Sequence, residues 1–398
     1  MNIPFPSKVI LKPSLISMVA VSASFAAWLF PSFGAIRKGF DNPAQLDFSS
    51  FSMLSCWYLL IFLSFYSGEK LGQLWTWSKT NPLEGLLDLD ANFLYYTFTL
   101  VSAIGTAATL FRILRVLSWQ ETIVFVALGQ ANALKDALYE DYSIGLVSVR
   151  YLVLYSASIA LYRMIRWRSF SAINLCNMLL LAVSTFILGS RLIFMATLLT
   201  TILLLTLHRN VVRISLLKTI VLGAVCFLIL GVANILRNNQ FYETNHLSFA
   251  QAGISEIVAY LGSPFQVAIG SVPVMDKLIK GPDETYRDLV DVEEELNSNS
   301  AFVHLHEVMG YFSWAYIAIL CLFMGFVFEF LRSLGQTAFL LPCGAILYAS
   351  AELWRLDLFQ QGIFVVWMVT GIGLPVFLLA GQRFFRFLGG TEGIGVRE

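Results

Sequence analysis

Long apolar stretches, separated by short polar segments, dominate the chain. Backbone N–H and C=O groups find no partners in lipid, so an apolar stretch of about 17–25 residues is expected to cross the bilayer as a helix. About ten such stretches are present, by the same length criterion, at 14–33, 50–67, 91–111, 145–162, 174–189, 191–207, 217–234, 308–330, 337–353 and 359–380. The pattern predicts an all-α polytopic integral membrane protein with a single transmembrane domain over residues 1–398.

Two of these predicted spans follow each other directly. The stretch 174–207 would be about 50 Å long at 1.5 Å per residue, which is too long for one crossing. Gly189, Ser190 and Arg191 interrupt it near its middle. We expect a tight helical hairpin with an arginine at its tip.

Basic residues in short loops set the expected orientation, because cytoplasmic loops carry an excess of Lys and Arg. Two short loops are basic, and their residues are Arg163, Arg166 and Arg168 in one and His208, Arg209, Arg213 and Lys218 in the other. Both loops are therefore predicted to be cytoplasmic. Both termini are then cytoplasmic too, and the hairpin tip faces the opposite side of the membrane.

Most of the polar chain falls on the predicted outer side, in segments 112–144 and 237–300. Segment 112–144 is too polar for a comfortable span, and we interpret it as an interfacial or re-entrant helical piece. Within the longer segment, residues 254–269 are apolar and helix-like, with Pro264 expected to bend the helix. Loops of this length are usually functional or disordered.

Composition narrows the function further. Hydrophobic residues make up 57% of the chain and charged residues 13%, against roughly 25% charged in soluble domains, which excludes an ordinary soluble enzyme. The 26 basic residues balance the 26 acidic ones, so no basic field favours nucleic acid as a partner. No Walker loop, GxGxxG or HExxH motif occurs, and the cysteines stand singly in apolar runs, so neither a metal nor a cofactor is expected.

Four arginines at the predicted outer ends of spans are candidates for binding an anion, because guanidinium geometry suits phosphate oxygens. They are Arg191, Arg237, Arg355 and Arg150. Each has a plainer interpretation. Arg191 could be a snorkelling anchor, and Arg150 an interface anchor. Arg355 could pair at helical spacing with Glu352 or Asp357, and Arg237 alone carries little information.

A polar group also precedes the span predicted at 308–330. Val303-His304-Leu305-His306-Glu307 offers two imidazoles and a carboxylate at a membrane entrance, which are the groups that a general base needs. The two histidines should point to different sides of a helix. A polar helix cap is the alternative, and a zinc site is improbable because no third ligand of the right kind follows.

The order of these features resembles the bacterial oligosaccharide repeat-unit polymerases, the Wzy-type O-antigen and exopolysaccharide polymerases. The matching features are the Gly189-Ser190-Arg191 tip, a basic turn and a further span, the Tyr-x-x-Pro-like Tyr260–Pro264, the Glu307–Gly325 segment and the outward Arg355. The resemblance covers roughly residues 90–380, and it lies in the order of the motifs.

The resemblance implies a GT-C-like membrane glycosyltransferase that joins repeat units carried on undecaprenyl diphosphate, with inversion and without a metal. Arg191, Arg237 and Arg355, joined by Arg150, would bind the diphosphate. Glu307, acting with His306, would be the catalytic base. The implied partners are undecaprenyl-diphosphate-linked glycans and membrane lipid, and a chain-length regulator protein is a further candidate.

Two other functions remain open from the sequence. An O-antigen ligase shares the many-span plan and the lipid-linked donor, but it transfers finished glycan to lipid A. A transporter or permease would also have about ten spans, although transporters often show inverted repeats and mid-membrane charges, and no paired half-sequences are visible here. A purely structural scaffold is the least specific alternative.

Overall fold

The computed structural model describes residues 11–29, 47–77, 91–127, 146–188, 190–207, 228, 249–280, 299–334 and 337–389. Throughout these ranges every regular element is a helix, and none is a strand. The all-α expectation is therefore confirmed for the described residues. The predicted span 217–234, apart from residue 228, lies outside them.

The helices have the following bounds, in chain order: α1 Pro13–Leu29, α2 Phe48–Trp77, α3 Ala91–Val116, α4 Trp119–Ala127, α6 Leu146–Val149, η1 Arg150–Leu152, α7 Val153–Trp167, α8 Ala172–Ala182, η2 Val183–Ile187, α9 Arg191–Leu207, α12 Phe249–Ser271, η3 Val272–Val274, α13 Met275–Lys280, α15 Ala301–Met309, α16 Phe312–Ser333, α17 Thr337–Glu352, η4 Leu358–Gln360 and α18 Gly362–Gly389. Of these, η1, η3 and η4 are 3₁₀ helices, and η2 is a π-helical turn.

Three of the described helices are long and apolar enough to cross a membrane, at Phe48–Trp75, Asn92–Val116 and Phe312–Ser333. Five shorter apolar helices accompany them, at Pro13–Leu29, Ala172–Ile187, Arg191–Thr206, Ala338–Glu352 and Gly362–Leu378. All eight coincide with stretches that the hydropathy pattern selects. The structure thus supports a membrane protein, while the number of crossings stays a prediction.

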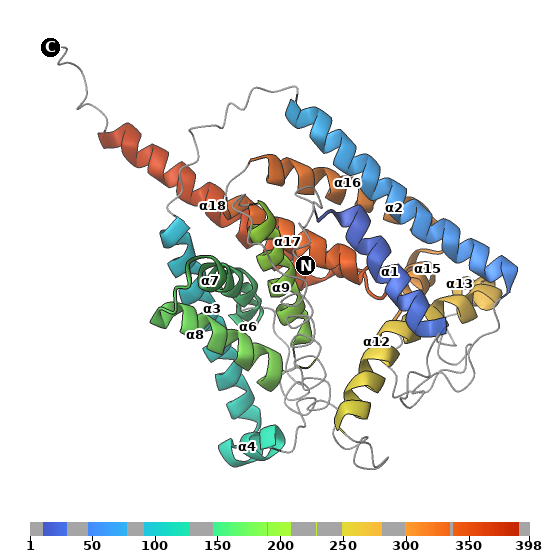
Figure 1. Ribbon diagram of the computed structural model, residues 1–398, viewed down its shortest axis with the longest axis horizontal. Helices are drawn as coiled ribbons and strands as arrows, with labels where there is room; N and C mark the ends of the chain where they lie inside the picture. The colour runs from blue at the N-terminus through green and yellow to red at the C-terminus, as the bar shows by residue number, and fades with distance from the viewer. Residues whose placement is uncertain are drawn as a thin grey trace, which may run out of the picture.

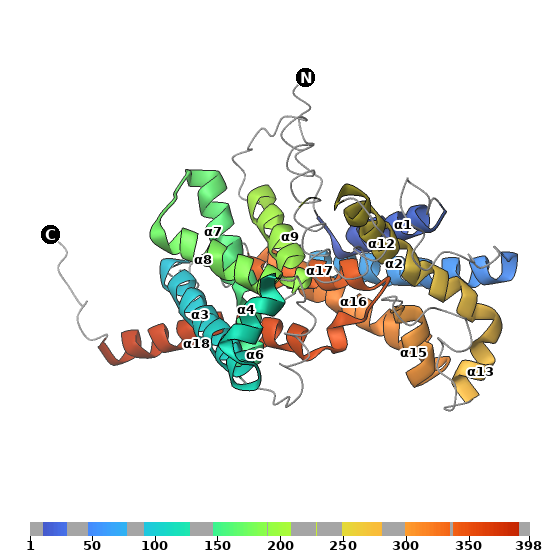
Figure 2. The ribbon, with the colours of Figure 1, turned by 90° about the horizontal axis from the view of Figure 1, so that it is seen from below.

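The helices form two groups joined by a central layer (Figure 1). Helices α3, α6, α7 and α8 gather on one side, and α1, α2, α12 and α16 gather on the other. Helices α9 and α17 lie between the groups in both views (Figure 2). Helix α17 is largely buried and packs against α9, α18, α1 and α16, so it forms the centre of the fold.

Helices α2 and α16 run parallel and in close contact. Trp57 packs against Trp314 near one end of the pair, and Gln73 donates to Glu329 near the other. Glycine makes the approach possible, because a Cβ on Gly68 would lie 2.0 Å from the carbonyl oxygen of Leu322. Small residues at such contacts let two helix backbones approach closely within a membrane.

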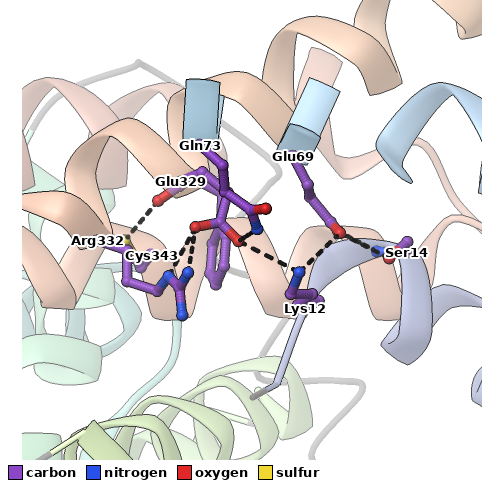
Figure 3. A network of polar contacts seen from close by, with 8 residues as sticks. Lys12, Ser14, Glu69, Gln73, Glu329, Arg332 and Cys343 are labelled. Carbon is purple, nitrogen blue, oxygen red and sulfur yellow. Dashed lines mark hydrogen bonds and ion pairs between the residues drawn. The ribbon is translucent and has the colours of Figure 1, made fainter. Parts of the chain in front are cut away.

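A buried ion network closes one end of this pair (Figure 3). Lys12 Nζ, at the start of α1, lies 3.8 Å from Glu69 Oε2 and 3.7 Å from Glu329 Oε1. Ser14 donates to Glu69 through both its backbone N–H and its hydroxyl, and Arg332 donates to Glu329. The two buried carboxylates, Glu69 and Glu329, are thus paired and hydrogen-bonded, as burial requires, and the network ties the start of α1 to α2 and α16.

Two boundaries differ from the sequence prediction. The span expected to begin at 308 begins at Phe312, because Gly310 has a φ of +57° and separates α15 from α16. The span expected to end at 162 continues as helix to Trp167, which places Arg163 and Arg166 within α7. An apolar pattern does not reveal a break made by one glycine.

The outer segments are described in part. The helix of 91–111 continues to Val116, and α4 follows within segment 112–144. In segment 237–300, the helix expected at 254–269 is present as α12, with Pro264 inside it. Helix α12 packs along α1, where Ser24 donates to the carbonyl of Leu261 and Trp28 to the side chain of Gln266.

Candidate functional site

The turn between η2 and α9 places Arg191 at the start of α9. Helix α8 passes into the π-helical turn η2, and the backbone N–H of Ser190 then bonds to the carbonyl of Ser184 at 3.0 Å. Ile193 N–H returns to the carbonyl of Ser190 and begins the next helix. Gly189 lies outside the described residues. The helix break before Arg191 is therefore present as the sequence predicts, but α8 and α9 each pack against α7 rather than along each other, which differs from the expected tight hairpin.

The segment between α17 and α18 places Arg355. The backbone N–H groups of Arg355 and Leu356 both bond to the carbonyl of Glu352 at 2.8 Å, which ends α17 in a tight turn. Asp357 then caps η4 by accepting from the N–H of Phe359 at 3.0 Å. Its other oxygen accepts from the hydroxyl of Tyr316 at 3.0 Å. Hydrogen bonds within the turn and one hydrogen bond to α16 therefore fix the segment that carries Arg355.

Both arginines lie over one aromatic ring, that of Tyr260 on α12. The Cζ atom of Arg355 is 4.6 Å from the ring centroid, and that of Arg191 is 5.3 Å from it. Guanidinium groups within about 6 Å of a ring are attracted by its π electrons. We call Arg191, Tyr260, Tyr348, Glu352 and Arg355 the Tyr260 cluster. It brings together α9, α12 and the end of α17.

Glu352 is the anion of the cluster. Its Oε2 accepts from Nε and Nη2 of Arg355 at 3.0 and 2.7 Å. Its Oε1 accepts from the hydroxyls of Tyr348 at 2.7 Å and Tyr260 at 3.2 Å. Burial disfavours the charge on Arg355, but the adjacent Glu352 carboxylate outweighs that effect and raises the pKa of the guanidinium. Arg355 is therefore charged at any physiological pH.

The cluster is electrostatically suited to an anion. Its five side chains hold two guanidinium groups and one carboxylate, so it has a formal charge of +1 when both tyrosines are neutral. Burial raises the pKa of Tyr260 to about 12, which keeps that hydroxyl protonated. Glu352, Tyr348 and Arg355 are buried, whereas Arg191 and Tyr260 are partly exposed. A fixed, preorganised pair of guanidinium groups can stabilise charge that develops on an oxygen.

His306 lies apart from this cluster, in an aromatic pocket. Its Nδ1 lies 2.7 Å from the carbonyl of Phe302, and its Nε2 accepts from the indole N–H of Trp314 at 2.9 Å. Trp57 packs on the ring at 5.1 Å between centroids. The side chain is fully buried, and burial lowers its pKa. Because the indole N–H engages Nε2, the ring is neutral and carries its proton on Nδ1.

Glu307 and His304 occupy the exposed side of α15. The two histidines therefore point to different sides of the helix, as predicted. The contacts of His306 are with Phe302, Trp314 and Trp57 rather than with members of the Tyr260 cluster. In this structure both ring nitrogens of His306 are engaged within the aromatic pocket. Its expected role as part of the base stays a prediction.

The two remaining arginines are not part of the cluster. Arg237 lies outside the described residues. Arg150 begins η1, is 3% exposed, and lies over the ring of Tyr151, to whose hydroxyl Nη2 donates at 3.0 Å. An interface anchor keeps its charged head in water, and a buried guanidinium does not fit that description.

Sequence reasoning finds Arg191, Arg355 and Tyr260, but it misses Tyr348 and leaves Glu352 only as an alternative salt-bridge partner. Tyr348 stands four residues before Glu352 on α17, a spacing that puts both on one helix face. This spacing is the sequence feature from which Tyr348 could have been predicted as a neighbour of Glu352. Among the residues that the structure describes, no group of three or more His, Cys, Asp or Glu side chains could hold a metal ion.

No protein-family model matches the chain, and no curated protein or solved structure is found to be similar to it. The interpretation of the site therefore rests on its own geometry and chemistry.

Proposed function

We propose that the chain is a membrane glycosyltransferase that polymerises undecaprenyl-diphosphate-linked oligosaccharide repeat units into O-antigen or exopolysaccharide. One observation carries the proposal. Arg191 and Arg355, which the order of sequence motifs selects as diphosphate ligands, lie over the same ring of Tyr260 at 5.3 and 4.6 Å. Two residues chosen separately for one role are thus neighbours in space.

The chemistry requires little beyond this pair. A hydroxyl oxygen of the incoming unit attacks the anomeric carbon of the growing chain, and the bond from that carbon to the diphosphate oxygen breaks, with inversion. Negative charge then develops on the departing diphosphate, where guanidinium groups stabilise it. The proton of the attacking hydroxyl passes to a base. Glu307, which is exposed near the end of α15, remains the proposed base.

The proposal includes a topology that the sequence predicts. It comprises about ten crossings in a bacterial inner membrane, a GT-C-like arrangement, cytoplasmic termini and a periplasmic site. The parallel α2 and α16 and the position of Lys12 beside their final turns support it. These contacts put the start of α1 and the ends of α2 and α16 on one side, which is what the predicted orientation requires.

The glycan pattern of a deletion strain tests the function and separates it from ligation. Loss of a polymerase leaves single repeat units on the lipid acceptor, and the wild-type gene restores the ladder. Loss of a ligase leaves no glycan on lipid A at all. A strain without the gene that still produced a full ladder would overturn the proposal.

A further inference from the structure

Arg150 has an unusual environment for a charged side chain. It is 3% exposed, and only its Nη2 is hydrogen-bonded, to the hydroxyl of Tyr151. Its Nε and Nη1 are buried and have no hydrogen-bond partner within the described ranges. A buried charge normally requires a paired and hydrogen-bonded partner. The Nε–H and Nη1–H groups lie on different edges of the guanidinium and point apart, so each can donate to a separate anionic oxygen.

Hydroxyl groups lie at the same level of the fold. Gly105 on α3 packs directly on Arg150, because a Cβ there would meet the backbone nitrogen of Arg150 at 2.4 Å. The next residue, Thr106, has a buried Oγ1 without a partner among the described residues. Thr106 is itself only 3% exposed. One further donor therefore lies within a residue of the contact between α3 and η1.

The π-helical turn η2 contributes two more hydroxyls at this level. Helices α3 and α8 run in step, since Tyr95 donates to Asn174 and Asn177 donates to Thr99. Further along, Ile113 of α3 packs with Leu188. Thr106 comes seven residues after Thr99, and Ser184 comes seven residues after Asn177, so this register is expected to bring Ser184, and Thr185 after it, to the level of Thr106. Their hydroxyl oxygens are also buried and unpartnered in the described structure, and π-helical turns are frequent at functional sites.

We propose that Arg150, with Thr106, Ser184 and Thr185, forms a second anion-binding site, which takes the diphosphate of a lipid-linked substrate. The inference rests on the proposed function, because a polymerase must hold two lipid-linked units and the Tyr260 cluster would serve one of them. The segment from η2 to α9 carries a part of each site, with Ser184 in η2 and Arg191 at the start of α9.

A lipid-linked anion fits this place better than a free one. Helix α3 carries a row of exposed apolar side chains at four-residue spacing, Tyr96, Leu100 and Ile104. This spacing places them along one helix face. Such a row is a surface on which a polyprenyl chain can lie. Inorganic pyrophosphate offers the same oxygens without the polyprenyl chain. Comparing its affinity with that of undecaprenyl diphosphate therefore distinguishes a site for a lipid-linked anion from a site for a free one.

The test counts bound lipid on the intact chain. Native mass spectrometry of the protein in phosphatidylcholine nanodiscs with undecaprenyl diphosphate should show two bound molecules. Arg150→Gln should leave one, and the Arg191→Gln/Arg355→Gln double variant should also leave one. Two molecules on Arg150→Gln would overturn the inference. Equal affinity for inorganic pyrophosphate would overturn the lipid-linked assignment.

A milder variant guards against misfolding. Thr106→Val keeps the side-chain shape and removes an unsatisfied hydroxyl, so without ligand its Tm should equal or exceed that of the wild type. Its affinity for undecaprenyl diphosphate should fall, by roughly tenfold for one lost hydrogen bond to a charged group. Unchanged affinity would contradict the site.

Arg150→Gln gives a second readout in the same preparation. If Arg150 binds a ligand, the variant should keep its ligand-free Tm and lose part of the Tm increase caused by undecaprenyl diphosphate. A lower ligand-free Tm with an unchanged increase would identify a merely structural arginine. Failure of the proposed function is distinguishable, because polymer synthesis could be absent while two diphosphates still bind.

Discussion

Arg355 donates two hydrogen bonds to a single oxygen of Glu352, from Nε at 3.0 Å and from Nη2 at 2.7 Å. The two residues are three apart, at the point where α17 ends. Because Glu352 also accepts from Tyr260 and Tyr348, this one carboxylate holds the guanidinium over the ring of Tyr260. Glu352 thus positions Arg355, and it also keeps that buried cation paired.

Glu352→Gln should therefore destabilise the protein as well as lower its activity. Removing one partner of a buried ion pair leaves an uncompensated charge and costs about 3–5 kcal/mol. Thermal unfolding in detergent should show a clear decrease in Tm. Glu307→Gln is the matched control, since that carboxylate is exposed on α15, and its Tm should not change. Equal Tm values for Glu352→Gln and the wild type would argue against the positioning role.

The shared ring of Tyr260 predicts a graded series. Tyr260→Phe keeps the aromatic face for both guanidinium groups and loses only a hydrogen bond to Glu352, so polymer yield should fall by a small factor. Tyr260→Ala removes the face, and the yield should fall about tenfold or more, since two cation–π contacts of roughly 0.5–2 kcal/mol each are lost. The measurement is the initial rate of polymer synthesis from lipid-linked repeat units for the wild type, Tyr260→Phe and Tyr260→Ala.

A control for this series is Phe111→Ala. Phe111 carries Arg115 over its ring at 4.8 Å and is exposed on α3, away from the cluster. Its rate should stay near that of the wild type. If Tyr260→Phe were as inactive as Tyr260→Ala, the hydroxyl rather than the stacked ring would be the essential part.

Glycines between α2 and α16 give a prediction about stability alone. Gly68→Ala would place a Cβ 2.0 Å from the carbonyl oxygen of Leu322, so the two helices must separate. We expect a loss of about 1–3 kcal/mol, the usual effect of overpacking. In Gly373→Ala a Cβ meets nothing within 4 Å, so that variant should be as stable as the wild type. A comparison of the two Tm values decides, and equal values would contradict the close packing.

The buried His306 predicts a pH dependence of stability. Burial holds its folded pKa below the ordinary value of 6.5, so the unfolded chain binds more protons just below that pH. The contribution of the neutral, buried His306 to the free energy of unfolding is therefore complete above about pH 6.5, and it decreases as the pH falls toward the folded pKa. Tyr311, which also faces the ring, stays neutral, because its hydrogen bond to Asp276 raises its pKa.

The measurement is Tm between pH 7.5 and 5.5 for the wild type, His306→Asn and His304→Asn. The wild type and His304→Asn should lose stability in parallel, because His304 is exposed. His306→Asn should start lower and change less over this range. A slope in His306→Asn equal to that of the wild type would assign the pH dependence to other groups.

The sequence predicts much of this architecture, because lipid imposes one solution on every apolar stretch. The helices at α1, α2, α3, α9, α16 and α17 all follow from hydropathy and length. The break at Gly310 does not follow, since the residues on both sides of it are apolar and a single positive φ leaves no periodic trace. Helix α12 continues on both sides of Pro264, and the bend expected at this proline stays a prediction.

The site is predictable only in part, for a related reason. The hydropathy pattern predicts that Arg191 and Arg355 lie at span ends and on the same side of the membrane. Their meeting over Tyr260 depends on how α12 packs against α1, through contacts such as those of Ser24 and Trp28. Tertiary packing of this kind leaves no local signal. The same holds for His306, whose pocket is built by Trp57 and Trp314 from two other helices.

The most direct test of the account is synthesis of polymer by the purified chain in nanodiscs, from lipid-linked repeat units, without nucleotide or added metal. The account predicts a ladder of products on a gel, which Arg191→Gln and Arg355→Gln should each reduce strongly and Arg115→Gln should leave unchanged. If the folded wild-type protein gives no ladder with the correct repeat unit, the polymerase assignment is contradicted.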